Sequence, residues 1–353
     1  MPNRGRRAVP AHGAPRDSLP VHGARGQGAR GRHDDECTGC DRECGCRRAR
    51  RRRTRVAAHA GPRLGAARVK PVPFTYVRAE SVEQAVDALR AHGGEAKLLA
   101  GGQSLVPALN MRLARPSVLV DLNRVPGLDR IDEENGGIRI GALVRQSAAE
   151  RAQLVHERCP LLAKSLPLVG HFVTRNRGTI GGSIAHADAA AELPLALVAL
   201  AGSVITTLRT IPAADFFVGH FTTALADDEL VVASTWPRAR SGEGSAFGEF
   251  APRHGDFALA SAACVLRVEN GAVAEARLAV GSVTDRPELL DVEPLLGRPL
   301  DDDGVRSLGT AAAAAVDPPP NLHGSPRYRR ALLGTLVERA LRTAWARATE
   351  TPS

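Results

Sequence analysis

The sequence is poor in cysteine, and the cysteines it has are unevenly placed. Four of the six lie between Cys37 and Cys46, which leaves only Cys159 and Cys264 for the rest of the chain. Two isolated cysteines argue against a disulfide framework and fit a reducing cytoplasm. They are also too few for an iron–sulfur cluster, which commonly needs four cysteine ligands. This part of the chain therefore cannot build such a cluster alone.

Long apolar runs are also absent. No apolar segment approaches the roughly 20 residues that a helix needs to cross a membrane. The N-terminus lacks the apolar core of a secretory signal. We therefore predict a cytoplasmic protein without a membrane span.

Positive charge is confined to the start of the chain. Residues 1–70 carry 18 basic and six acidic side chains, so they account for more than the whole net charge of +9. The remainder is mildly acidic. A basic protein would ordinarily suggest a nucleic-acid or membrane partner, but this distribution predicts neither for the body of the chain.

Residues 1–68 are mostly Arg, Gly, Ala, Pro and His, without a sustained helical or strand period. We interpret them as a disordered basic extension. The spacing of Cys37, Cys40, Cys44 and Cys46 leaves a zinc or nucleic-acid module open, although no flanking hairpin or helix would orient four ligands. Ordered patterning begins at Val69, and valine codons can start bacterial translation, so a mistaken start site is another explanation of the segment.

From residue 69 onward, short apolar strands alternate with amphipathic helices, which predicts an α+β fold. Ser81 and Gln84 form a capping box at the start of the first helix. Asn270-Gly271 joins two apolar runs and predicts a hairpin. We predict a domain over 69–242, made of two subdomains, and a smaller α+β domain over 243–350.

Two glycine-rich segments carry the clearest chemistry. Paired glycines let backbone N–H groups converge on an anion without obstruction by Cβ, and a helix start that follows adds a favourable dipole. Two such loops could hold both phosphates of a pyrophosphate from opposite sides. Neither matches the P-loop or the G-x-G-x-x-G fingerprint, and a single Gly-Gly is by itself an ordinary turn. The candidate residues are Leu98, Leu99, Ala100, Gly101, Gly102, Gln103, Ser104 and Leu105, with Thr179, Ile180, Gly181, Gly182 and Ser183.

These loops and several later motifs resemble the FAD-binding medium subunits of molybdenum hydroxylases, the family of xanthine dehydrogenase and carbon monoxide dehydrogenase. The resemblance runs from about Val69 to Ala348. The further motifs, in chain order, are His186-Ala187-Asp188, Glu192-Leu193-Pro194, Arg253-His254-Gly255-Asp256-Phe257-Ala258, Val280-Gly281-Ser282-Val283, Asp285-Arg286-Pro287 and Ser325-Pro326-Arg327-Tyr328-Arg329.

The resemblance implies a vanillyl-alcohol-oxidase-type (PCMH) FAD-binding domain, followed by a domain of the CO dehydrogenase flavoprotein C-terminal type. It implies that both glycine loops hold the FAD pyrophosphate. An acidic residue at the position of Glu192 contacts the cofactor in relatives, and an apolar residue at that of Val231 lies by the isoalloxazine. For Asp188, contact with the cofactor and capping of the next helix both stay open. Because FAD carries the redox chemistry, we nominate no catalytic acid or base and no metal ligand.

The implied function is electron transfer. FAD would accept electrons from an iron–sulfur small subunit, in a heterotrimer with a molybdopterin large subunit, and pass them to NAD+, a quinone or another acceptor. A stand-alone FAD-dependent reductase or oxidase of the same fold is the alternative, which the second-domain motifs disfavour. A third reading, a basic nucleic-acid or metal-binding protein, rests only on residues 1–68.

The sequence also departs from the family pattern. Ala189 stands where the family has proline, and Arg327 where it has glutamate. The stretch from Ala201 to Ile211 is short and lacks the usual Gly-rich hairpin turn, so it gives no firm prediction of edge strands. We expect Arg253 and Asp256 to form a structural pair at the domain junction.

Overall fold

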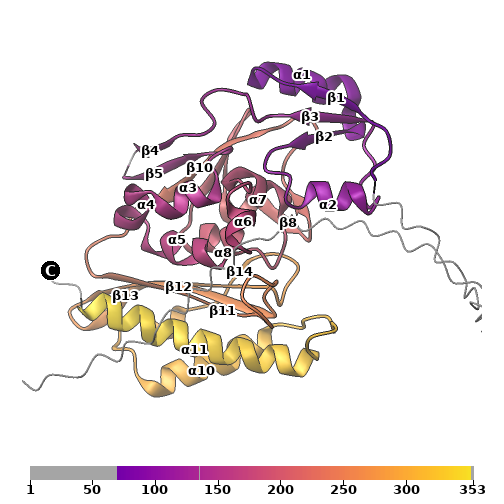
Figure 1. Cartoon of the computed structure of the whole chain (residues 1–353). Coiled ribbons are helices and arrows are strands. Elements are labelled where there is room, and N and C mark those ends of the chain that lie inside the picture. The colour runs from indigo at the N-terminus through magenta and orange to yellow at the C-terminus, as the bar shows by residue number, and fades with distance from the viewer. Residues whose placement is uncertain (1–69, 135, 351–353) are drawn as a thin grey trace, which may run out of the picture. The chain divides into compact units, whose positions relative to one another are not determined.

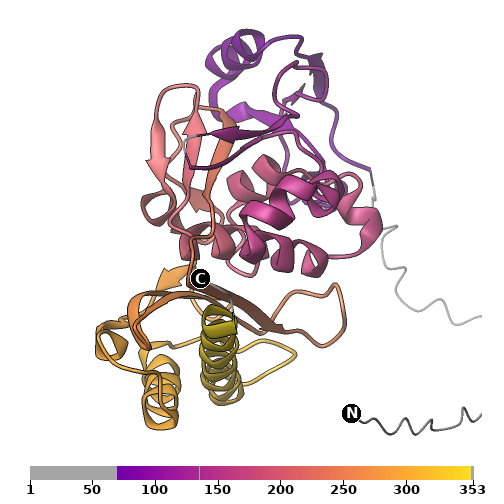
Figure 2. The same cartoon turned by 90° about the vertical axis from the view of Figure 1, so that its left-hand side faces the viewer.

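The computed structural model describes residues 70–134 and 136–350. The interpretation of residues 1–68, including the four clustered cysteines, lies outside these described residues. The described chain forms one compact unit of mixed helix and strand content, shown from two sides in Figures 1 and 2. The α+β prediction is confirmed.

A small parallel sheet opens the unit. Its strands lie in the order β1-β3-β2 and are β1 (Thr75–Arg78), β2 (Ala96–Leu99) and β3 (Val118–Asp121). Helix α1 (Val82–His92) follows β1, and the Ser81 side chain accepts a hydrogen bond from the N–H of Gln84 at 3.2 Å. Gln84 in turn accepts from the N–H of Glu80 at 2.9 Å, one residue earlier than a standard capping box. Helix α2 (Leu105–Asn110) follows β2.

A five-stranded antiparallel sheet forms the second layer, in the order β4-β5-β10-β6-β7. Its strands are β4 (Ile131–Glu134), β5 (Gly137–Gly141), β6 (Ser203–Thr206), β7 (Thr210–Pro212) and β10 (Val231–Pro237). Edge strands β6 and β7 form although the sequence lacks a glycine turn between them. The Thr206 hydroxyl replaces it: Oγ1 accepts from the N–H groups of Leu208 and Arg209 and donates to Glu229.

Short helices pack beside this sheet and carry the second glycine segment. They are α3 (Gln146–Arg151), α4 (Gln153–Arg158), α5 (Pro160–Ser165), α6 (Phe172–Arg175), α7 (Ile180–His186) and α8 (Glu192–Ala199). A single turn, α9 (Ala213–Phe216), then leads into the small hairpin of β8 (Phe217–Gly219) and β9 (Thr222–Thr223). Helix α8 is buried almost all round, which explains its uniformly apolar sequence.

The last part of the chain is a four-stranded antiparallel sheet with two long helices on one face (Figure 2). Its strands are β11 (Glu243–Phe250), β12 (Ala260–Glu269), β13 (Ala272–Gly281) and β14 (Glu288–Leu289), and its helices are α10 (Asp302–Ala315) and α11 (Pro326–Glu350). The predicted hairpin at Asn270-Gly271 joins β12 to β13 in antiparallel register.

Strand β12 belongs to two hydrophobic cores at once. Ala263 and Val265 lie in the core that surrounds α8. Their neighbours Cys264 and Leu266 lie in the core under α10 and α11. Successive side chains of a strand point to opposite faces, so a nearly continuous apolar run is what a strand covered on both sides requires.

No helix in the described part of the chain is both long enough and apolar enough to cross a membrane.

Candidate functional site

The first glycine segment lies at the carboxyl end of β2. Leu98 and Leu99 are the last residues of that strand, the chain turns through Ala100 to Ser104, and Leu105 begins α2. Gly102 adopts a φ of +73°, a left-handed conformation that favours glycine. Gln103 and Ser104 are exposed at the tip of the turn, and the Gln103 side chain donates to the carbonyl of Gly101 at 3.3 Å.

The N–H groups of this turn are available to a ligand. Within residues 70–134 and 136–350, no acceptor contacts the backbone N–H of Gly101, Gly102, Gln103 or Ser104. Free N–H groups on consecutive residues form a concave site that suits an anion. The first loop therefore has the donors that the sequence predicted.

The second glycine segment is built differently from the prediction. Thr179 caps α7 by accepting from the N–H of Gly182 at 3.0 Å, and Gly181 donates to the carbonyl of Ala142 at 3.0 Å. Ile180 and Ser183 also donate within the protein, to Val144 and Thr179. We expected these amides to face an anion, but the structure uses them internally, because β5 and the segment after it run alongside the start of α7.

Glycine at 181 and 182 is required for space instead. A Cβ atom on Gly181 would lie 2.5 Å from the Cβ of Ala142, and one on Gly182 would lie 2.6 Å from the Thr179 hydroxyl and 3.7 Å from the Cβ of Ala100. The last distance shows that Gly182 faces the first loop across a narrow gap.

The two segments touch although about 80 residues separate them in sequence. A Cβ on Gly101 would lie 2.5 Å from the carbonyl oxygen of Arg177 and 2.8 Å from the Cα of Gly178. Only glycine permits this approach of the two backbones. The structure thus brings the predicted loop residues into one cradle, with free donors on one side and the closely packed start of α7 on the other.

Sequence reasoning missed four polar side chains behind this cradle. Asn123 donates to the carbonyl of Ala100 at 2.9 Å, and Arg145 donates to the Asn123 side chain at 2.6 Å. Asp121 accepts from Asn123 and from the hydroxyl of Tyr76. Asp121 ends β3 and Asn123 follows two residues later, beside the end of β2 in a parallel sheet, and that position was the available signal.

Hydrogen bonds, burial and neighbouring charges shift the pKa values in this group. Burial would raise the pKa of Asp121, but hydrogen bonds from Tyr76 and Asn123 outweigh it and leave that pKa lowered. Burial lowers the pKa of Arg145, and the positive charge of Arg177 lowers it further, while Asp121 opposes both. The positive charge of Arg177 therefore opposes that of Arg145.

Asp188 and Glu192 lie beyond the far end of α7. Asp188 follows that helix and accepts from the N–H of Ala190 at 2.9 Å, so it stabilises the turn before α8 rather than capping the helix itself, whose N-cap is Ala191. Glu192 is the first residue of α8. Burial raises its pKa to about 7, with a further contribution from the charge of Asp188.

Val231 and Arg175 are both buried. Val231 is the first residue of β10, is 6 % exposed and belongs to the core around α8. Arg175 is buried and pairs with Glu150 at 2.8 Å, so it is a structural residue and not an exposed cation.

The motif after β11 also differs from expectation. Arg253 and Asp256 are joined only by a backbone hydrogen bond of 3.1 Å, and the described residues contain no ion pair between their exposed side chains. The expected pair was wrong. Gly255 explains the motif better, because a Cβ there would meet the ring of His171 at 2.6 Å, so this loop packs tightly on the segment before α6.

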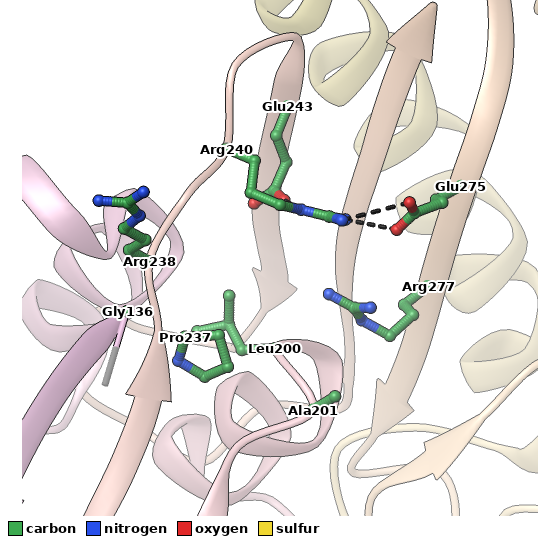
Figure 3. A pocket seen from close by; sticks show the side chains of 9 residues that line it. All are labelled: Gly136, Leu200, Ala201, Pro237, Arg238, Arg240, Glu243, Glu275 and Arg277. Carbon is green, nitrogen blue, oxygen red and sulfur yellow. Dashed lines mark hydrogen bonds and ion pairs between the residues drawn. The ribbon is translucent and has the colours of Figure 1, made fainter. Parts of the chain in front are cut away.

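A separate pocket of about 360 Å³ lies at the carboxyl end of α8 (Figure 3). Arg240 crosses it and pairs with Glu243 at 3.3 Å and also with Glu275. Arg277 donates to the carbonyl of Ala199 at 2.9 Å. None of its lining residues belongs to the glycine loops. Its charged side chains serve to join the two halves of the described unit.

Comparison with known proteins agrees with this arrangement. Residues 72–239 match the family model of the FAD binding domain in molybdopterin dehydrogenase, and residues 245–344 match that of the CO dehydrogenase flavoprotein C-terminal domain. The alpha subunit of the 6-hydroxypseudooxynicotine dehydrogenase complex from Paenarthrobacter nicotinovorans is 42% identical over 80% of this chain and 98% of its own length.

Two further relatives are a carbon monoxide dehydrogenase and a quinoline 2-oxidoreductase. The carbon monoxide dehydrogenase medium chain of Hydrogenophaga pseudoflava is 36% identical over 78% of this chain and 99% of its own, and a structure of that enzyme superposes with a TM-score of 0.76. Quinoline 2-oxidoreductase from Pseudomonas putida 86 superposes with a TM-score of 0.75 at 33% identity, covering 79% of this chain and 99% of its own. The chain therefore belongs to the family of FAD-binding medium subunits of molybdenum hydroxylases, and its cofactor is FAD.

Proposed function

We propose that this subunit transfers electrons within a larger enzyme. It takes them from a partner iron–sulfur subunit, which stands beside a molybdopterin-carrying large subunit, and passes them to NAD+, a quinone or another acceptor. The observation that carries this proposal is the meeting of two glycine loops, one of them with free backbone N–H groups, in a chain of this flavoprotein family. In the part of the chain that the structure describes, no group of three His, Cys, Asp or Glu side chains is placed to hold a metal ion.

The cradle fits the diphosphate of FAD. The free N–H groups from Gly101 to Ser104 would hold its oxygens, and the exposed Gln103 and Ser104 side chains can add donors. A Cβ on Gly101 would fill the space where the two loops meet. Asp188 and Glu192 lie past the opposite end of α7, which has seven residues and so spans about 10 Å. We assign the loops to the diphosphate and the two acids to the flavin half, because FAD is an extended molecule.

When bound, FAD supplies the capacity to accept two electrons and release them again. The protein positions the cofactor and controls charge around it. Glu192 is half-buried, and its pKa of about 7 lets it hold or release a proton near neutral pH. A carboxyl in that state adds no fixed negative charge to the site below this pH.

The two cysteines of the described chain are unsuited to bind a cluster. Burial raises the pKa of both thiols to about 12, so both are protonated and unreactive at neutral pH. The Cys159 thiol donates to the carbonyl of Pro237 at 3.2 Å, and Cys264 lies in the core under α10 and α11. Buried reduced thiols fit the cytoplasmic location that we also propose.

The decisive experiment compares the single subunit with the co-expressed complex. The FAD-loaded subunit is mixed anaerobically with carbon monoxide, 6-hydroxypseudooxynicotine or quinoline, the compounds after which its relatives are named, and flavin absorbance is followed. We expect no bleaching. The subunit should co-purify with its iron–sulfur and molybdopterin partners, and the substrate that suits the complex should then bleach the flavin.

Two results would contradict the proposal. One is substrate-driven bleaching of the lone subunit, which would favour the stand-alone reductase or oxidase. The other is a subunit that purifies alone, loaded with FAD, from cells that express all three chains.

A further inference from the structure

A chain of side-chain hydrogen bonds joins the two glycine loops from behind. Asn123 donates from Nδ2 to the carbonyl of Ala100, at 2.9 Å. Arg145 donates from one terminal nitrogen to Asn123 Oδ1, at 2.6 Å, and from the other to the carbonyl of Arg177, at 2.5 Å. The two carbonyls at its ends directly precede Gly101 and Gly178, the residues through which the loops touch.

The ends of this chain are themselves anchored. Asp121 Oδ1 accepts from both the N–H and the side chain of Asn123, at 2.8 and 2.6 Å, and its other oxygen accepts from Tyr76 on β1. The backbone of Arg145 forms an antiparallel bridge with Thr179, the cap of α7. Neither Asn123 nor Arg145 can therefore move without moving a loop or breaking a hydrogen bond.

We infer that Arg145 is a positioning residue that, through Asn123, fixes the separation of the two glycine loops around the FAD diphosphate. The inference rests on the proposed assignment of these loops to the diphosphate. A planar guanidinium suits the role because its fork of donors reaches two acceptors in fixed directions. A lysine side chain ends in a single nitrogen, so it can bond well to only one of the two acceptors.

Electrostatics give Arg145 a second effect in the same direction. Its guanidinium and that of Arg177 lie close enough to oppose each other, and Asp121 offsets only part of the repulsion. A bound diphosphate between the loops would remove the remainder.

The test measures FAD affinity in variants of the full chain. Apo-protein is titrated with FAD, flavin fluorescence reports binding, and thermal unfolding of each apo-protein reports its fold. Arg145→Ala should weaken FAD binding about tenfold or more, since it removes two charge-assisted hydrogen bonds. Arg145→Lys should restore part of the affinity. The matched control is Arg124→Ala, which removes an exposed arginine beside Asn123 that makes no side-chain hydrogen bond or ion pair in the described chain.

A double-mutant cycle separates positioning from general destabilisation. Asn123→Ala and Arg145→Ala act on one chain of contacts, so their effects on FAD affinity should be clearly less than additive. Arg124→Ala combined with Arg145→Ala should be additive. Two results would overturn the inference: an Arg145→Ala protein that binds FAD as tightly as Arg124→Ala, or effects of Arg145→Ala and Asn123→Ala that are fully additive. Neither result would contradict the proposal that the chain binds FAD. Wild-type affinity for FAD that survives Gly101→Ala would instead overturn the assignment of the loops.

Discussion

Gly101 occupies a position where the backbone of another segment leaves no room for any side chain. A Cβ there would lie 2.5 Å from the carbonyl oxygen of Arg177, well below the 3.0 Å that real Cβ contacts essentially never pass. The smallest substitution, to alanine, must therefore push the two loops apart. The free N–H groups of the first loop would then shift relative to the second loop.

We predict that Gly101→Ala weakens FAD binding about tenfold or more, the effect of losing at least one charge-assisted hydrogen bond. Equilibrium dialysis against FAD measures the change. Gly94→Ala is the matched control, because a Cβ at Gly94 meets no atom within 4 Å. Equal FAD affinity in the two variants would remove the contact between the loops from the binding site.

The sequence predicted the positions of these glycines but not the reason for each. Glycine pairs are visible in a sequence, and their conformational freedom favours an anion site. The sequence does not show that the N–H of Gly181 bonds to the carbonyl of Ala142 and is therefore not free for a ligand, because this bond depends on how β5 runs past α7. Asn123 and Arg145 escaped for the same reason: each is an ordinary polar residue until the fold brings it behind the cradle.

Strand β12 was predictable as a strand, but its packing was not. Its apolar run predicted a strand, and β12 and β13 form the expected hairpin. The run alone does not tell which core each face joins. The structure places alternate residues of β12 in different cores, so damage to one face of this strand must be felt by both halves of the unit.

We predict that Leu266→Ala lowers the free energy of unfolding by about 2–5 kcal/mol, as expected for truncating a fully buried leucine, and that both cores still unfold in one transition. The two tryptophans permit the measurement, since Trp236 lies in the core around α8 and Trp345 packs against the core under α10 and α11. Trp236→Phe and Trp345→Phe backgrounds each report one core during denaturant unfolding.

Leu113→Ala serves as the comparison, because Leu113 is 78 % exposed and its loss should change stability by no more than about 0.5 kcal/mol. Transitions of Trp236 and Trp345 that separate in the Leu266→Ala protein would show that β12 does not couple the cores.

Polar contacts also cross between the two halves of the described unit. Lys164 on α5 donates across to the carbonyl of Ser245 on β11 at 3.1 Å, and Arg347 on α11, in the same half as β11, donates to that carbonyl at 2.7 Å. Burial lowers the pKa of Lys164 to about 8, and the charge of Arg347 lowers it further. The order of the two matched family regions and the α+β class were predictable from motifs over the whole chain. Contacts of this kind were not, because they join residues about 80 and 100 positions apart.

Glu192 and Glu249 interact electrostatically between the two halves of the described unit. Glu192 begins α8, and Glu249 lies on β11 with one carboxyl oxygen buried and without a hydrogen-bond partner in the described chain. Burial raises the pKa of Glu249 to about 8, and the negative charge of Glu192 adds to the effect. Asp188 and Arg175 also face Glu192, and Arg175 is already paired with Glu150.

These shifts give the stability of the apo-protein a definite pH dependence. Each carboxyl binds its proton more tightly in the folded chain than in the unfolded one, where its pKa is near 4.5. The folded state therefore holds more protons between about pH 4.5 and pH 8, and its stability must fall as pH rises through that window.

Glutamine imitates the protonated carboxyl at every pH. We predict that Glu249→Gln matches the wild type at pH 5 and melts at least about 2 °C higher at pH 9. Thermal unfolding between pH 5 and pH 9 provides the measurement, with Glu95→Gln as a control, since that exposed side chain has no bonding partner in the described residues. If the wild-type and Glu249→Gln melting curves stay parallel across this range, Glu249 does not hold a proton at the junction, because only a group that ionises in the folded protein can make the two diverge.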